Sequence, residues 1–334
     1  MSETVVVALG GNAILKASQR GTVEQQRENL GETARQIAGL VKQGYRVVLT
    51  HGNGPQVGNI LLQQEEAAQL VPPMPLDVCG AQTQGMIGYL LQQAMGEALR
   101  AAGLHTPVIT VVTQVEVDRQ DEAFLDPSKP VGPFFKATKA QQLAAERGWV
   151  VKLIGAAGWR RVVPSPRPRF ITELPVINDL VQMGVLVITC GGGGIPVARS
   201  SDGRLSGVEA VIDKDLAAEQ LALGLAADTL VILTDVPGVA INFGQPDEEY
   251  LGKVSVGELE LYGRQGHFPA GSMGPKVAAA IGFVRGGGRR AVITAMDLLQ
   301  DAMHGQAGTI VQEIGLEFNA AEERRDVDGK KHEG

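Results

Sequence analysis

Three lysines beside glycine-rich or aspartate-rich turns are the side chains of this chain best suited to chemistry. Lys214 stands between two aspartates in the segment AVIDKDLAA, where an apolar run gives way to an expected helix. Lys276 follows the turn AGSMGP, and Lys129 opens the segment KPVGP. An ammonium group next to such a turn can neutralise a bound anion, and Asp215 could hold the ammonium of Lys214 in place. Because an isolated lysine is usually a solvated surface charge, the prediction depends on what surrounds these three.

Glycine-rich loops supply those surroundings. Four of them directly follow expected strands, with the sequences LGGN (9–12), HGNG (51–54), GGGG (191–194) and TDVPG (234–238). In open α/β sheets ligands bind beyond the carboxyl ends of the strands, where glycine lets backbone N–H groups approach an anion. The start of a following helix adds its positive dipole end. One such loop is an ordinary turn, but four at the same place in a fold predict an anionic ligand.

Neither common nucleotide-binding fingerprint is present. The chain has no GxxxxGK[ST] loop, and its run of four glycines continues into Ile195-Pro196 rather than into a GxGxxG motif. This argues against a P-loop enzyme and a dinucleotide-dependent oxidoreductase. Phosphoryl transfer needs positioning and positive charge more than covalent help, so backbone amides and lysines would suffice. His51 could act as a base, but the five histidines form no cluster, and a structural hydrogen-bonding role is favoured.

The elements that must position these loops alternate between short apolar strands and amphipathic helices. The strands are expected at 4–9, 45–50, 107–112, 185–190, 229–233, 290–294 and 308–311. The helices are expected at 22–43, 57–69, 77–102, 172–183, 214–226 and 275–285. This alternation predicts an α/β fold whose parallel strands are joined by helical crossovers. Residues 118–169 are rich in proline and charge, so they are predicted to project as an inserted subdomain with one short helix and short strands.

Composition narrows the class of protein further. The 334 residues carry a net charge of −7 and only 4% aromatic side chains, which argues against binding to nucleic acid or anionic membranes. No apolar run reaches the ~18 residues that span a bilayer, and the N-terminus lacks a secretory pattern, so a cytoplasmic protein is expected. Cys79 and Cys190 lack metal-ligand spacing and are predicted to be buried thiols. The charged tail 314–334 is predicted to be disordered.

Eight ordered motifs resemble those of the carbamate kinases, a branch of the amino-acid-kinase family. They are VVVALGGNAI, LTHGNGPQVG, KPVGPF, RRVVPSP, GGGGIPV, AVIDKDLAA, LTDVPGV and AGSMGPKV, and they extend from about residue 5 to residue 311. The resemblance implies a three-layer α/β/α sandwich around a mainly parallel open sheet, with a small protruding subdomain. It also implies a homodimer and reversible phosphoryl transfer from ATP to carbamate, giving ADP and carbamoyl phosphate, with Mg²⁺.

The resemblance also assigns functions to parts of the chain. A single domain, 1–313, would have an N-terminal lobe at about 1–190 for the phosphoryl acceptor and a C-terminal lobe at about 191–313 for the nucleotide. The implied catalytic residues are Lys129, Lys214, Lys276 and Asp215. The implied acceptor and phosphate ligands are Gly10, Gly11, Asn12, Gly52, Asn53 and Gly54. The implied nucleotide ligands are Gly191, Gly192, Thr234, Asp235, Val236 and Met273. No metal ligand is assigned to the protein, because the nucleotide phosphates would hold Mg²⁺.

Two further hypotheses follow. Lys129, on the protruding subdomain, is expected to close over the phosphoryl group as part of a lid. Because the mixed anhydride of carbamoyl phosphate is more labile than ATP, the reaction is expected to run toward ATP synthesis, in arginine breakdown.

Two alternatives are kept. A kinase of the same fold could act on another small carboxylate or amino acid, although HGNGPQVG offers mainly backbone donors. A nucleotide sensor without catalysis would have lost lysines, whereas all three stand in their motifs.

Overall fold

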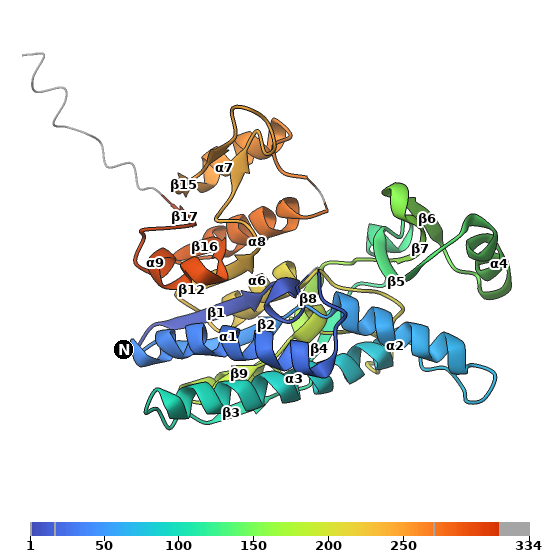
Figure 1. The fold of residues 1–334 in the computed structure, drawn as a ribbon, viewed down its shortest axis with the longest axis horizontal. Coiled ribbons are helices and arrows are strands. Elements are labelled where there is room, and N and C mark those ends of the chain that lie inside the picture. The colour runs from blue at the N-terminus through green and yellow to red at the C-terminus, as the bar shows by residue number, and fades with distance from the viewer. Residues whose placement is uncertain (1, 17, 270, 314–334) are drawn as a thin grey trace, which may run out of the picture.

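A sheet of eight strands forms the centre of the computed structural model, which describes residues 2–16, 18–269 and 271–313 (Figure 1). Its order is β15 (Lys253–Ser255), β17 (Thr309–Gln312), β16 (Arg290–Ala295), β12 (Thr229–Thr234), β1 (Thr4–Leu9), β2 (Arg46–His51), β9 (Leu186–Ile188) and β3 (Val108–Thr110). Neighbouring strands are parallel except for β16 and β17. All seven strands expected from the sequence are present, which confirms the mainly parallel sheet.

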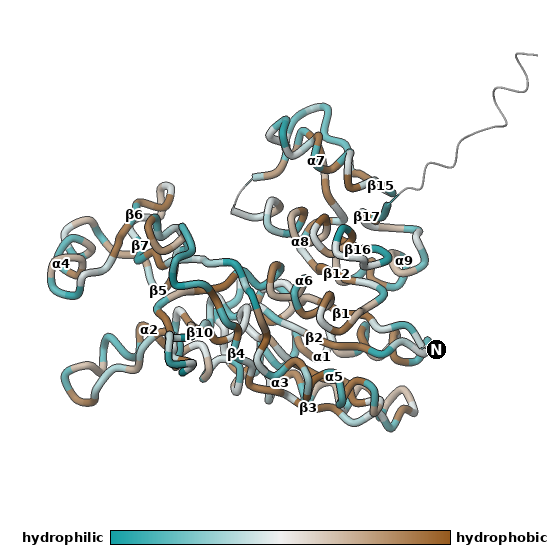
Figure 2. Tube along the Cα trace, turned by 180° about the vertical axis from the view of Figure 1, so that it is seen from behind, coloured by the Kyte–Doolittle hydropathy of each residue, from teal (hydrophilic) through white to brown (hydrophobic). Residues whose placement is uncertain are grey.

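Helices cover both faces of this sheet because its central strands are apolar on both faces. On one face, Val5, Val7 and Leu9 pack with α1 (Val23–Lys42), α3 (Leu76–Ala101) and α9 (Leu299–Met303). On the other face, Val6 and Ala8 pack with α5 (Leu174–Gln182), α6 (Lys214–Gly224) and α8 (Met273–Arg285). Figure 2 shows the central strands as hydrophobic. The three-layer α/β/α sandwich is therefore confirmed.

A three-stranded sheet stands apart from the main body in Figure 1. It consists of β5 (Lys129–Phe135), β7 (Gly158–Val163) and β6 (Val151–Ile154), with α4 (Ala137–Arg147) between β5 and β6. We call residues 129–163 the projecting unit. Its two strand prolines, Pro130 and Pro133, lie on the edge strand β5, where a missing N–H costs least. The sequence predicted one short helix and short strands within residues 118–169, and the projecting unit contains both.

A second, four-stranded sheet connects the projecting unit to the body. Its order is β11 (Leu205–Gly207), β10 (Ile195–Arg199), β4 (Gln114–Val117) and β8 (Pro168–Ile171). The chain leaves through β4 and returns through β8, and these two strands pair with each other. The chain segments that lead into and out of the projecting unit are thus held together in one small sheet. This sheet was not predicted from the sequence.

Several elements near the loops complete the fold. The predicted helix at 57–69 begins earlier, as α2 (Gly54–Ala67), so its N-terminus lies inside the HGNG loop. The hairpin β13 (Ala240–Ile241) and β14 (Glu249–Tyr250) and the helix α7 (Val256–Arg264) were not predicted from the sequence. Cys79 and Cys190 are both free and buried, as predicted. The tail 314–334 lies outside the described residues. No helix among the described residues is long and apolar enough to cross a membrane.

Candidate functional site

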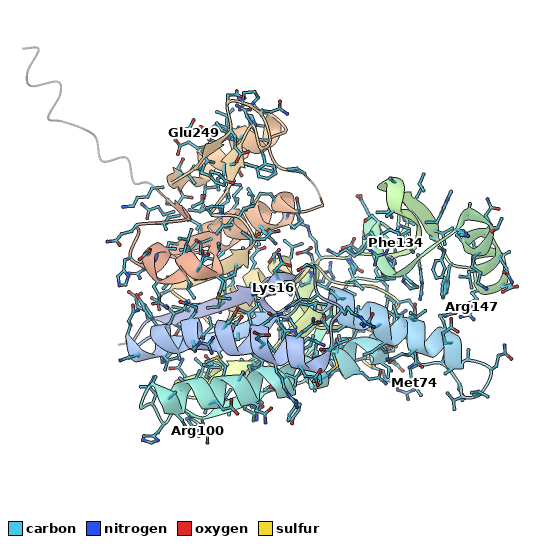
Figure 3. The ribbon with its side chains drawn as sticks, viewed as in Figure 1. Lys16, Met74, Arg100, Phe134, Arg147 and Glu249 are labelled. Atoms are coloured by element: carbon cyan, nitrogen blue, oxygen red, sulfur yellow. The ribbon has the colours of Figure 1, made fainter. Side chains whose placement is uncertain are left out.

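One cavity of about 1190 Å³ lies beyond the carboxyl ends of β1, β2 and β12. It is lined by loops from both halves of the chain and by the projecting unit. In Figure 3, Lys16 labels the segment after β1 that lines the cavity, and Phe134 labels the projecting unit. The cavity brings together all but one of the site residues expected from the sequence: Gly10, Gly11, Asn12, Gly52, Asn53, Gly54, Lys129, Gly192, Lys214, Asp215, Thr234, Asp235, Val236, Met273 and Lys276.

A buried carboxylate with two ammonium groups lies at the centre of the cavity wall. Asp215 is 3% exposed, and its Oδ1 lies 2.5 Å from the Nζ of Lys214. Its Oδ2 lies 2.9 Å from the Nζ of Lys276. Lys214 and Asp215 begin α6, and Lys276 lies in the first turn of α8. Two helix N-termini therefore meet here. The Asp213 side chain caps α6 by accepting a hydrogen bond from the N–H of Asp215 at 2.9 Å.

Burial and the neighbouring charges shift the pKa values of Asp215 and Lys214. Burial acts to raise the pKa of Asp215, but the two lysines outweigh it and keep that pKa below its ordinary value. Burial lowers the pKa of Lys214, and the charge of Asp215 partly opposes this. A buried charge without its partner is expensive, so the three groups are interdependent. They present two ammonium groups to one point of the cavity.

The third predicted lysine comes from the projecting unit. The Nζ of Lys129 donates to the Oδ2 of Asp213 at 2.8 Å. Asp213 therefore serves the cluster twice, because its other oxygen caps α6. This ion pair ties the first residue of β5 to the helix that carries Lys214 and Asp215, although the residues are 84 positions apart in the sequence.

Glycines in the loops after β1 and β2 lie close to other parts of the chain. A Cβ on Gly10 would lie 2.8 Å from the carbonyl oxygen of Leu233, at the end of β12. A Cβ on Gly52 would lie 3.4 Å from the Cδ of Lys214. The side chain of Asn53 donates to the hydroxyl of Thr83 on α3 at 2.8 Å. The loops after β1 and β2 therefore touch both the opposite lobe and the lysine cluster.

The glycine run packs beneath these loops. A Cβ on Gly191 would lie 2.4 Å from the Nε2 of His51, and one on Gly192 would lie 2.3 Å from the Nδ2 of Asn53. A Cβ on Gly193 would lie 2.3 Å from the carbonyl oxygen of Ile212. Gly192 lines the cavity next to Asn53, whereas Gly191 lies under His51 and is not part of the lining. Both glycines thus lie beside the loop after β2, and direct contact with a nucleotide stays a prediction.

Arg160 is a cationic lining residue that sequence reasoning missed. It lies on β7, its Nη2 donates to the carbonyl of Gly132 at 2.8 Å, and its guanidinium lies 4.9 Å from the centre of the Phe134 ring. Burial lowers its pKa, and its Nε has no partner among the described residues. The sequence feature that could have indicated Arg160 is the pair of arginines in the motif RRVVPSP. Adjacent strand residues face opposite sides, and Arg161 instead pairs with Glu209.

The far end of the cavity, in the C-terminal lobe, is mostly apolar. Its lining includes Leu233, Ala240, Phe243, His267, Pro269, Met273 and Met296. His267 accepts a hydrogen bond from the backbone N–H of Asn242 at 3.2 Å, which fixes the turn before Phe243. An apolar slot beside a cationic cluster suits a ligand with a flat ring at one end and phosphates at the other. Only Met273 of these residues was predicted.

We expect Asp215→Asn to lower the free energy of unfolding by about 3 kcal/mol at pH 7, because two buried ammonium groups lose their counter-charge. The folded-state pKa of Asp215 lies below its unfolded value, so its stabilisation is present above pH 3.8 and is lost as the pH falls. Denaturant titrations of both proteins at pH 7 and pH 3 should show the difference shrinking in acid. Asp301→Asn, at an exposed helical acid, is the control. Equal stabilities at pH 7 would contradict this account.

Comparison with known proteins identifies the family of this chain. The sequence model of the amino acid kinase family matches residues 3–295. The carbamate kinases of Thermococcus kodakarensis and Pyrococcus horikoshii are 56% and 51% identical to this chain, over 92% and 93% of it and 98% and 99% of theirs. The structure of carbamate kinase from Giardia lamblia bound to AMP-PNP has a TM-score of 0.89 at 47% identity, covering 93% of this chain and 99% of that one. The chain belongs to the amino acid kinase family and, within it, to the carbamate kinases.

Proposed function

We propose that this protein transfers a phosphoryl group reversibly from ATP to carbamate, giving ADP and carbamoyl phosphate. The observation that carries the proposal is the cluster of Lys214, Asp215 and Lys276, which lies where glycine loops of one lobe meet an apolar slot of the other. A small acceptor would be held on one side of the cluster and a nucleotide on the other. The transferred group would then pass directly in front of two fixed ammonium groups.

In this mechanism the lysines neutralise the charge that spreads over the oxygens of the transferred phosphoryl group. Asp215 orients both ammonium groups and does not touch the substrate. Backbone N–H groups of the loops 10–12 and 52–54 would bind the acceptor and the transferred phosphate. Carbamate is already an oxyanion, so no general base is needed. His51 is unsuited to that role, because burial lowers its pKa to about 4.

Magnesium would accompany the nucleotide, held mainly by its phosphates. The cavity-lining carboxylates fit this arrangement. Asp213 and Asp215 are engaged by lysines, and Glu32 pairs with Lys16. Within the described chain, the carboxylate of Asp235 accepts only the hydroxyl of Thr234, at 3.1 Å, and that of Asp297 has no side-chain partner. Asp235 and Asp297 are therefore the side chains most able to contact a hydrated ion. The metal would screen the nucleotide phosphates, while the lysines act on the group in transfer.

The physiological direction is proposed from chemistry. Carbamoyl phosphate is a mixed anhydride and is more labile than ATP, so the reaction is expected to yield ATP, in arginine breakdown. A cytoplasmic location stays a prediction.

A kinase for a larger amino-acid acceptor is the second candidate. It would need side chains for an α-amino and a carboxyl group, but the Asn53 amide is already bonded to Thr83.

The function is tested by coupled ATP formation from ADP and carbamoyl phosphate, with and without Mg²⁺. We expect Mg²⁺-dependent turnover, with far lower rates for acetyl phosphate and glutamyl phosphate. Lys214→Ala and Lys276→Ala should each lower kcat by roughly 10³, because each removes a cation from the transition state. Lys42→Ala, in the last turn of α1, is the control. A wild-type preference for glutamyl phosphate would favour the second candidate, and near-normal rates in either lysine variant would remove that lysine from the mechanism.

We also propose that the projecting unit is a lid that delivers Lys129 and Arg160 to the phosphoryl group. Both side chains line the cavity and come from neighbouring strands of the unit. The unit touches the body through polar contacts, since Lys129 pairs with Asp213 and Arg147 with Glu65. A small apolar cluster, made by Val57, Leu76, Cys79, Val131 and Val163, lies at its base. Attachment through polar contacts and a small apolar cluster is typical of elements that move.

Lys129→Ala is expected to lower kcat by roughly 10² while leaving the KM for ADP within about twofold, because its charge acts on the transferred group rather than on the nucleotide. Steady-state kinetics in both substrates measure this. Lys152→Ala removes an exposed lysine from the same unit and should behave as wild type. An unchanged kcat with weaker ADP binding would contradict the lid role.

The homodimer expected from the resemblance is proposed to form at the β3 edge of the main sheet. The outer side of β3 has no partner strand among the described residues. Exposed apolar side chains surround it, namely Met86 and Tyr89 on α3, Ile109 and Val112 on and after β3, and Val176 on α5. An edge strand between two helices can meet its own copy across a twofold axis.

Light scattering should give a dimer for the wild type, and Tyr89→Asp should shift it toward monomer by placing a charge in the apolar interface. Leu153→Asp, an equally exposed site on the projecting unit, is the matched control. A monomeric wild type, or a Tyr89→Asp dimer as stable as the control, would exclude this interface.

A further inference from the structure

His51 occupies a fixed and unusual place at the end of β2. It is 1% exposed, and its strand is paired on both sides, by β1 and by β9. Its Nδ1 lies 2.9 Å from the carbonyl oxygen of the next residue, Gly52. A carbonyl oxygen can only accept, so Nδ1 carries the proton. Because burial lowers the pKa of the ring to about 4, the ring is neutral and Nε2 is unprotonated.

This hydrogen bond sets the orientation of one peptide unit. The bond between Gly52 and Asn53 is trans, so the Asn53 N–H points away from the carbonyl that His51 holds. Both residues line the cavity, and Asn53 is the residue immediately before the first turn of α2. The Asn53 N–H has no acceptor among the described residues. It is thus a free donor, next to a helix N-terminus, whose direction depends on the ring of His51.

The ring is itself held from the other side. The missing side chain of Gly191 leaves the space that the ring occupies, since a Cβ there would lie 2.4 Å from Nε2 and 2.5 Å from Cε1. The carbonyl of Gly191 is fixed by the Nε2 of Gln84 at 3.0 Å, and the same amide group binds Thr113. One continuous chain of contacts therefore leads from the glycine run, through the buried ring of His51, to the Gly52 carbonyl in the loop expected to bind the acceptor.

We infer that His51 is a positioning residue for the phosphoryl acceptor: by holding the Gly52 carbonyl it turns the Asn53 N–H into the cavity, where it binds the anionic group of the acceptor. The inference rests on the proposed function. It assigns His51 to positioning the backbone rather than to acting as a general base. The ring touches neither substrate. It acts through a backbone amide, so its loss should weaken binding of the acceptor and leave the nucleotide unaffected.

Three variants of the full chain test this. His51→Leu removes the donor, and His51→Asn retains an N–H near the position of Nδ1. Gly191→Ala leaves His51 in place but displaces its ring. We expect His51→Leu and Gly191→Ala to raise the KM for carbamoyl phosphate about tenfold, the effect of one misdirected hydrogen bond to an anion, with the KM for ADP within about twofold. His51→Asn should recover to within about threefold of wild type.

Further readouts separate positioning from simple destabilisation. Gly257→Ala, a glycine on α7 with open space around it, is the control for the glycine change, and thermal unfolding is followed for every variant. The wild type and His51→Asn should share one pH profile between pH 5.5 and 9, because the ring does not ionise there. Unchanged KM in His51→Leu and Gly191→Ala, equal damage in His51→Asn and His51→Leu, or parallel increases in the KM for ADP would overturn the inference.

A last measurement does not depend on turnover. Nuclear magnetic resonance should show the His51 ring protonated at Nδ1 only, and titration with inorganic phosphate should shift the Asn53 amide in the wild type and not in His51→Leu. A wild type that shows this response but makes no ATP from carbamoyl phosphate refutes the proposed function and leaves the positioning role standing. An Asn53 amide that ignores phosphate, or responds alike in both proteins, refutes the positioning role.

Discussion

The site depends on one carboxylate that holds two ammonium groups where little water reaches them. Asp215 can do this only if the first turns of α6 and α8 lie within hydrogen-bond distance of each other. The two helices also pack closely one turn along α6 from Asp215, where a Cβ on Gly282 of α8 would meet the carboxylate of Glu219 and that side chain would have to move. The helix packing and the charge cluster support each other, because without the carboxylate of Asp215 the repulsion between the two lysines would push the helices apart.

A second constraint acts on the backbone beneath the cavity. Two segments distant in sequence, the loop with His51 and Asn53 and the segment with Ile212, pack onto consecutive glycines of the run 191–193. Side chains there would separate the acceptor loop from the segment that leads into α6. Gly192 and Gly193 have φ angles of 68° and 93°, a conformation that other residues seldom adopt. The run thus serves as a close-packed support that keeps the acceptor loop and the lysine cluster in register.

The sequence predicted most of the central sheet because its strands are short apolar runs and four of them lead into glycine-rich loops. It also predicted that the loops and lysines would gather, since carboxyl ends of parallel strands share one edge. It missed β15, the eighth strand of the main sheet, and β13, β14, α7 and α9, although the spacing of Ser255 and Glu258 is that of a capping box at the start of α7. The sequence alone does not tell which of Arg160 and Arg161 faces the cavity, because the side to which a strand residue points depends on the strand register. Nor does it show that Gly191 supports His51, because that contact joins residues 140 positions apart.

Charge explains why an acidic protein can bind two anions in one cavity. The chain carries a net charge of −7, yet Lys129, Arg160, Lys214 and Lys276 converge on the cavity with Asp213 and Asp215 as their nearby counter-charges. Those two carboxylates are outnumbered by the four cations, although the rest of the cavity lining also carries Lys16, Glu32, Asp235 and Asp297. Two of the four cations come from the projecting unit and two from helices fixed on the sheet. The field at the phosphoryl position therefore depends on where the projecting unit lies, which links the arrangement of the fold to the chemistry of transfer.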